Sequence, residues 1–181
     1  MRWLKKKLPR CVLKGMTDYR HPVLRMHESY PDTLQGEEIP LYIAKEKADA
    51  YIPMMQPDEL IITADTIVWL DGEVLGKPRD REDALQMLRT MSGRTHEVFT
   101  GVCITTTDWQ RSFTAQTEVR FATLSEDEII YYVDNFKPMD KAGAYGVQEW
   151  IGFIGVENIS GSYYNIMGLP VQKLYRELLK V

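Results

Sequence analysis

Apolar residues change their spacing several times along this chain, and each spacing predicts a different kind of element. From Pro40 to Ile52 they recur at helical intervals, with lysines and acids at the intervening positions. Residues 59–70 form an almost continuous apolar run, which is typical of a buried strand or a bent pair of strands. Asp71-Gly72 then forms a strong hairpin signal, so a second strand arm is predicted over residues 73–75.

The remaining sequence predicts three helices and three strands. Asp80 can cap the first of these helices, which Gly93 stops, and Ser125-Glu126-Asp127-Glu128 resembles a capping box for the second. The expected elements are helices over 80–91, 125–135 and from 170 onwards, and strands over 97–106, 113–123 and 153–159. The first two of these strands form a long antiparallel hairpin in this prediction. The order of elements predicts an α/β or α+β domain, with a twisted mixed sheet flanked by helices.

Size and composition limit the classes of protein to consider. A chain of 181 residues, 44% apolar and 27% charged, is typical of a single globular domain, here expected over residues 1–181. The net charge of -4 argues against a nucleic-acid-coating protein, and no apolar run reaches membrane-spanning length. Cys11 and Cys103 lack the spacing of a zinc site or disulfide framework. We therefore expect a cytoplasmic protein with reduced thiols that binds neither nucleic acid nor membrane.

The most informative conflict in the pattern is Ala64-Asp65-Thr66, where an acid interrupts the longest apolar run. A carboxylate is costly to bury without a partner, so Asp65 is the leading candidate for a general base or metal ligand. A capping or turn aspartate is the structural alternative. The predicted hairpin brings Gly76-Lys77-Pro78 back beside Asp65, which places an amine near the carboxylate. That combination suits a metal-bound phosphate.

Other polar residues could complete such a site. Arg94 could clamp a phosphate bidentately, although His96 beside it is more often a structural histidine in such a position. Gln148 follows a segment of small residues and offers both a donor and an acceptor, which suits reading the edge of a nucleobase. Lys47 lies on a predicted helix, where most lysines are simply solvated.

Together these motifs resemble the Maf nucleotide pyrophosphatases, whose fold is akin to that of the inosine-triphosphate pyrophosphatases. The matching segments span roughly residues 28–181 and are Glu46-Lys47-Ala48, Ala64-Asp65-Thr66, Leu75-Gly76-Lys77-Pro78, residues 92–98, Thr100-Gly101, residues 140–148, Gly161-Ser162-Tyr163 and residues 165–170. The resemblance implies hydrolysis of a nucleoside triphosphate to the monophosphate and pyrophosphate with a divalent cation, Mg²⁺ or Mn²⁺. The resemblance also makes a homodimer a candidate assembly.

The resemblance implies particular roles for several residues. Asp65 matches the family's proton acceptor, and Lys47 and Lys77 match its phosphate-binding lysines. Glu28 matches an acidic position that serves metal or water beside Asp65. Thr66 and Gln148 match positions linked to base choice, and a threonine after the aspartate resembles the branch that acts on dTTP and UTP. Pyrimidine triphosphates, including modified ones, are therefore the expected substrates.

The first 27 residues depart from the family pattern. The family opens with an apolar strand and a Ser-x-Ser-Pro-Arg-Arg turn, whereas here only Pro9-Arg10 remains, Cys11 replaces the second arginine and the serines are absent. We interpret residues 1–27 as a frame-shifted, wrongly started or degenerate beginning, and expect it to impair turnover. In the alternative interpretation Arg10 and the neighbouring lysines form a looser basic clamp.

Two other functions fit part of the pattern. One is a house-cleaning pyrophosphatase for purine triphosphates such as ITP and XTP. The other is a catalytically weak nucleotide-binding or division-linked protein that retains the fold. A substrate panel would distinguish the first, and nucleotide binding without product release would indicate the second.

Overall fold

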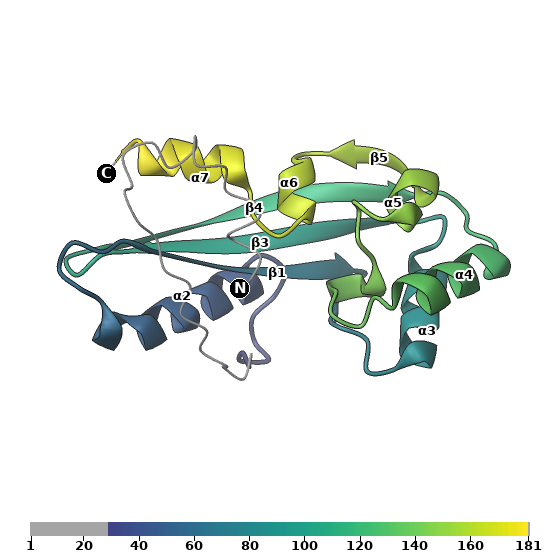
Figure 1. Ribbon diagram of the computed structural model, residues 1–181, viewed down its shortest axis with the longest axis horizontal. Helices are drawn as coiled ribbons and strands as arrows, with labels where there is room; N and C mark the ends of the chain where they lie inside the picture. Colours follow the sequence, from purple (N-terminus) through teal and green to yellow (C-terminus); the bar gives the residue numbers. More distant parts are fainter. Residues whose placement is uncertain (1–28, 181) are drawn as a thin grey trace.

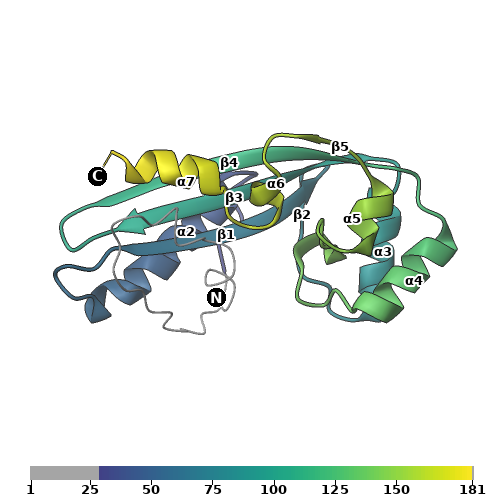
Figure 2. The same cartoon turned by 45° about the horizontal axis from the view of Figure 1, so that its top comes forward.

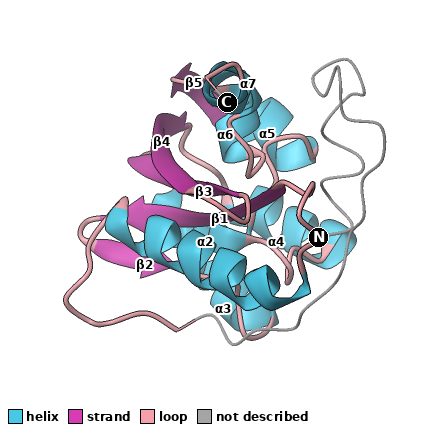
Figure 3. Ribbon diagram, turned by 90° about the vertical axis from the view of Figure 1, so that its left-hand side faces the viewer, coloured by secondary structure: helices cyan, strands magenta, loops and turns pink. Residues whose placement is uncertain are grey.

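Long antiparallel strands form the centre of the molecule, which is known from a computed structural model that describes residues 29–180 (Figure 1). The strand order is β2-β1-β3-β4-β5, and all four pairings are antiparallel. The strands are β1 Ile61–Leu70, β2 Glu73–Leu75, β3 Thr95–Thr105, β4 Gln110–Phe121 and β5 Val156–Ser160. Viewed from one end, β2 and β5 lie at the two edges of the sheet (Figure 3).

Helices cover both faces of the sheet and one of its ends. Helix α2 lies along β1 and β3, α6 and α7 lie on the other face, and α3, α4 and α5 gather at one end (Figures 1 and 2). Their bounds are α2 Glu38–Tyr51, α3 Arg81–Met91, α4 Glu126–Phe136, α5 Trp150–Gly155, α6 Tyr163–Ile166 and α7 Val171–Leu178, with 3-10 turns at Ile52–Met54 and Ala142–Ala144. Within residues 29–180, no helix has the length and apolar character needed to cross a bilayer.

This architecture confirms the predicted mixed α/β class with helices around a sheet. The predicted caps are also confirmed, because Asp80 accepts a hydrogen bond from the Asp83 amide and Ser125 forms a full capping box with Glu128. Asp71 and Gly72 both adopt positive φ in the turn between β1 and β2. The sheet is more regular than predicted, since every pairing among the described residues is antiparallel.

The strand predicted over residues 153–159 was wrong at its start. Residues 150–155 form α5, and the strand begins only at Val156. The sequence of α5 did not indicate a helix, because some of its apolar residues are buried and others are exposed to solvent. Ile151 is fully buried in the core, whereas Phe153 is 76% exposed. The helix buries Ile151 in the core and leaves Phe153 in solvent.

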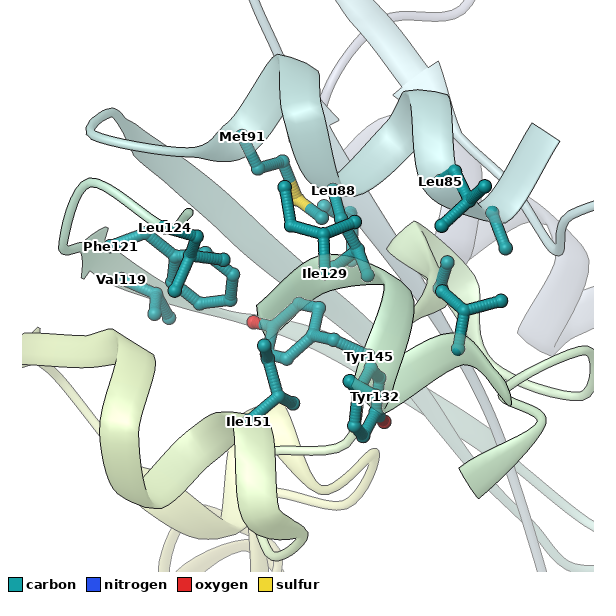
Figure 4. Packing of buried hydrophobic residues seen from close by; sticks show 14 of the residues in the cluster. Leu85, Leu88, Met91, Val119, Phe121, Leu124, Ile129, Tyr132, Tyr145 and Ile151 are labelled. Atoms are coloured by element: carbon teal, nitrogen blue, oxygen red, sulfur yellow. The ribbon is translucent and has the colours of Figure 1, made fainter. Parts of the chain in front are cut away.

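The largest core cluster lies between the sheet and α3, α4 and α5 (Figure 4). His96 projects into this region and is fully buried, with its Nε2 atom 2.8 Å from the Tyr145 hydroxyl and its ring edge-on to Phe121. Burial lowers the pKa of His96 to about 4. The structural interpretation of His96 is therefore confirmed, and the ring is neutral in the folded protein near pH 7.

Helix α2 lies very close to the sheet at Gly101 of β3. A Cβ atom at this position would overlap the backbone of Pro40 and Leu41. The neighbouring contacts of α2 are made by small or apolar residues, including Ile43, Ala44 and Ala48. The absent side chain of Gly101 therefore sets the spacing between helix and sheet.

We predict that Gly101→Ala destabilises the protein by about 1–3 kcal/mol or more, because backbone atoms cannot move aside as a flexible side chain can. Urea unfolding measures the effect. Gly76→Ala is the matched control, since a Cβ there would meet nothing within 4 Å, and its effect should stay below about 1 kcal/mol. Equal stability of the two variants would contradict the close approach.

We also predict a pH dependence of stability that comes from His96. The pKa of His96 falls from 6.5 to about 4 on folding, so between these pH values the unfolded chain binds a proton more readily than the folded protein does. With respect to His96, the folded state therefore has its full stability above pH 6.5 and loses stability as the pH falls towards 4. The free energy of unfolding should fall in this window by up to about 1.4 kcal/mol per pH unit. His96→Gln should flatten this slope in urea titrations at several pH values. An unchanged slope would refute the assignment.

Candidate active site

A cavity of about 580 Å³ is lined mainly by four segments, and Tyr30, Ile43 and Val98 complete the lining. The four segments are β1, β2 with the chain that follows it, the loop over residues 140–148 and the turn over residues 166–168. The cavity brings together Asp65, Thr66, Lys77 and Gln148, which the sequence had predicted as site residues. Its volume lies within the range of small-molecule sites.

Asp65 forms an ion pair with Lys47 at this cavity. The Lys47 Nζ atom lies 2.6 Å from Asp65 Oδ1, and the side chains are only 15% and 12% exposed. A partly buried carboxylate is tolerated because the ammonium and its hydrogen bond offset the loss of water. Lys47 of α2 therefore pairs with the carboxylate of Asp65 on β1 and stabilises its negative charge.

The two adjacent residues Asp65 and Thr66 face opposite sides of the sheet. Asp65 points towards α2, as Thr63 does through its hydrogen bond to the Ala44 carbonyl. Thr66 points towards α6, where its hydroxyl lies 2.8 Å from that of Thr100. This alternation is the ordinary geometry of a strand.

The cavity reaches both faces because the edge of β1 is open there. Strand β2 pairs only with residues 68–70 of β1, so within the described part of the chain residues 61–67 have no strand on that side. Accordingly, the cavity is lined by Ile43 on the α2 face and by Met167 and Gly168 beside α6. A ligand at this edge can therefore contact residues from both sides of the sheet.

Lys77 enters the cavity from the chain that follows β2. The Gly143 amide donates to the Gly76 carbonyl at 3.0 Å, which ties this segment to the loop over residues 140–148. Lys77 also lies close enough to Asp140 that its positive charge, after that of Lys141, helps to lower the pKa of Asp140. The predicted meeting of Lys77 and Asp65 at one site is therefore observed.

The turn after α6 is anchored by Asn165, which is fully buried. Its side-chain amide donates to the Val98 carbonyl at 3.0 Å and to the Ala115 carbonyl at 3.1 Å. The carbonyl of Asn165 in turn accepts from Thr100 at 3.4 Å. These bonds hold Met167 and Gly168 against the cavity and link them to Thr66 through Thr100.

The oxygen donors at the cavity suit a hard divalent cation. Asp65 and Asp140 are the carboxylates among the lining residues, and Mg²⁺ is usually held by one or two carboxylates together with substrate phosphates and water. No group of three or more His, Cys, Asp or Glu side chains that could hold a metal occurs in residues 29–180. The donor set therefore fits a cation that arrives with a phosphorylated substrate.

Two predicted site residues, Lys47 and Arg94, are not among those that line the cavity, although Lys47 reaches it through its ion pair with Asp65. The guanidinium of Arg94 instead donates to Asp71 and to the Thr90 carbonyl. Glu28 and Arg10, together with the whole atypical segment 1–27, lie outside the described residues.

Sequence reasoning assigned no role to several lining residues, including Tyr30, Asp140, Lys141 and Tyr145. Asp140 and Lys141 belonged to a recognised motif, but their exposure and partners depend on the fold. The charged pair Lys141 and Glu149, which encloses a run of small residues, was the available signal. Tyr145 gave no such signal, because a buried tyrosine in a loop has no periodic pattern.

Comparison with known proteins agrees with this geometry. The model of the Maf-like protein family matches residues 10–181. The chain is 71% identical over 151 residues to a dTTP/UTP pyrophosphatase of Bacteroides fragilis strain YCH46, covering 83% of this chain and 78% of the relative. It is 60% identical over 171 residues to one of Parabacteroides distasonis, covering 93% and 89% respectively. It is 49% identical over 162 residues to one of Flavobacterium psychrophilum, covering 90% and 83%. The chain therefore belongs to the Maf family.

Proposed function

We propose that this protein is a nucleoside triphosphate pyrophosphatase that converts dTTP and UTP to the monophosphate and pyrophosphate. The observation that carries the proposal is the Lys47–Asp65 ion pair at a cavity that also contains Lys77 and Gln148. The relatives at 49–71% identity bear the name dTTP/UTP pyrophosphatase, which supports this substrate class.

Asp65 acts as the proton acceptor in the proposed reaction. A water molecule loses its proton to the carboxylate while its oxygen forms a bond to phosphorus, and the bond between the α- and β-phosphates breaks. Pyrophosphate then leaves with the electron pair of the broken bond. Lys47 keeps Asp65 ionised and oriented, so the carboxylate is ready to accept a proton.

Lys77 and a divalent cation balance the negative charge of the triphosphate. Lys77 lies in the cavity between Gly76 and Pro78, and the proline restricts the backbone conformation of Lys77. Asp65 and Glu28 are the residues that we expect to hold Mg²⁺ or Mn²⁺, and the cation would neutralise charge that develops on the leaving pyrophosphate. Arg94 and Arg10 are the other proposed substrate contacts, and Arg94 would have to leave Asp71 to reach the phosphates.

Thr66 and Gln148 are the proposed contacts to the base. Both residues line the cavity, and Gln148 is exposed, so its side-chain amide is accessible to a ligand that enters the cavity. An amide can pair with both a donor and an acceptor on a pyrimidine edge. The expected preference for dTTP and UTP, including modified pyrimidines, depends on these two residues.

The other expectations from the sequence stay predictions. They are the homodimer, the single domain over residues 1–181, the cytoplasmic location and the impairment of turnover by residues 1–27. Analytical ultracentrifugation measures the first. Replacing residues 1–27 with the corresponding segment of the Bacteroides fragilis relative tests the last, since a large rise in kcat would establish impairment.

We predict that Asp65→Asn lowers kcat for UTP by at least about 100-fold, because the amide cannot accept the proton. Pyrophosphate release in the presence of Mg²⁺ or Mn²⁺ is the measurement. Asp58→Asn, which changes an exposed aspartate away from the cavity, is the matched control and should retain full activity. Equal activity of both variants would exclude Asp65 as the proton acceptor.

We predict that dTTP and UTP are hydrolysed faster than CTP, 7-methyl-GTP and ITP by the same protein. The preference for dTTP and UTP should be visible as a higher kcat/KM in the pyrophosphate assay. Faster hydrolysis of ITP would instead establish the purine house-cleaning function. Nucleotide-dependent thermal stabilisation without any product would establish a binding protein.

A further inference from the structure

The loop over residues 140–149 forms much of the cavity wall and is held by side chains that the proposed reaction does not use. Asp140, Lys141, Gly146 and Gln148 all line the cavity. The loop contains only one short 3-10 turn, at Ala142–Ala144, so regular secondary structure does not explain its shape. Backbone hydrogen bonds from the amides of Gly143, Ala144 and Glu149 hold part of the loop, and side-chain contacts hold the rest.

Lys141 joins the two ends of this loop. Its ammonium lies 2.8 Å from Asp140 Oδ1 and 3.2 Å from Glu149 Oε1. Burial by itself lowers the pKa of Lys141, but the bonds to these two carboxylates outweigh burial and raise the pKa above its ordinary value. Lys141 therefore stays charged and closes the loop by an ion pair across its ends.

Tyr132 of α4 fixes the other side of Glu149. The Tyr132 hydroxyl donates to Glu149 Oε2 and accepts a hydrogen bond from the Gly146 amide at 3.1 Å. Tyr132 is fully buried in the main core cluster (Figure 4). Both carboxylate oxygens of Glu149 and both functions of the hydroxyl are thus satisfied in a partly buried polar cluster, which favours a single arrangement of these groups.

The charges of this cluster argue against a role for Lys141 as a phosphate-binding lysine. Two carboxylates, those of Asp140 and Glu149, surround one ammonium, so the group as a whole is negative. A triphosphate gains little attraction from a cation that is already paired twice. The cluster is therefore better suited to holding the loop than to binding phosphate.

The cluster acts directly on the residues that face the cavity. A Cβ at Gly146 would lie 2.9 Å from Glu149 Cδ and 3.1 Å from Lys141 Cε, so the backbone there is packed against the cluster. Gln148 is the residue before Glu149, so two fixed oxygens on Glu149 restrict the backbone that carries the Gln148 side chain. The cluster thus determines the position from which the Gln148 side-chain amide faces the cavity.

We propose that Tyr132, Glu149 and Lys141 are positioning residues that orient Gln148 and the Gly146 backbone towards the nucleobase. This inference rests on the proposed function, because it assumes a nucleotide in the cavity. It assigns the cluster to recognition of the base half of the substrate, while Asp65, Lys47 and Lys77 serve the phosphate half.

The test compares binding of UTP with binding of inorganic tripolyphosphate, which lacks the base. Isothermal titration in the Asp65→Asn background with Mg²⁺ avoids turnover. Adding Tyr132→Phe, which removes only the hydroxyl, should weaken UTP binding by about tenfold or more and change tripolyphosphate binding by less than about twofold. Tyr131→Phe is the matched control on the same helix, since Tyr131 is 49% exposed, and it should change neither affinity.

A second variant, Glu149→Gln, keeps the size of the side chain but removes the charge that pairs with Lys141. It should give the same selective loss for UTP, and circular dichroism of each variant verifies folding. Unchanged UTP binding by both variants, or equal loss for both ligands, would overturn the inference and leave the proposed function intact. Failure of the unmodified protein to bind or hydrolyse any nucleotide would instead overturn the proposed function itself.

Discussion

The contact between α2 and the sheet at Gly101 determines the geometry of the candidate site. Gly101 pairs directly with Asp65 in the β1–β3 register, so this close contact lies beside the proposed proton acceptor. The helix can lie there only because Gly101 has no side chain. Lys47, two turns along the same helix, consequently reaches Asp65 at 2.6 Å. The absence of a side chain at Gly101 thus affects both the packing of α2 on the sheet and the position of Lys47 beside Asp65.

The site divides its tasks between the two faces of β1. On the α2 face, Lys47 and Asp65 form the charged pair that suits proton transfer near phosphate. On the α6 face, Thr66 joins a set of hydroxyl and amide groups that continues through Thr100 to Asn165. Within residues 29–180 no strand pairs with residues 61–67 of β1 on the side of β2, and the cavity is lined by residues from both faces. Under the proposed function, the α2 face would meet the phosphates and Thr66 on the α6 face would meet the base.

Several exposed ion pairs join the helices at the end of the molecule, including Arg81 with Asp134 and Arg89 with Glu126. Their side chains are largely in contact with solvent, so each contributes little to stability. The cluster around Tyr132 and Glu149 differs from them because Tyr132 is fully buried and the side chains of Lys141 and Glu149 are only 20% and 22% exposed. Protein partners, rather than solvent, therefore set the shape of the cavity wall.

Local sequence determined most of the helices, helix caps and turns of this protein. Helical periodicity, the caps at Asp80 and Ser125 and the Asp71-Gly72 turn act over a few residues, so the elements they predicted were found. Asp65, Lys77 and Gln148 were also identified, because their residue types conflict with their surroundings or belong to recognisable motifs. Tertiary structure alone decided that Arg94 pairs with Asp71 away from the cavity, that Phe153 belongs to a helix and that Glu149 bonds to Tyr132. Each of these outcomes depends on contacts between residues distant in the chain or on burial, which no local pattern encodes.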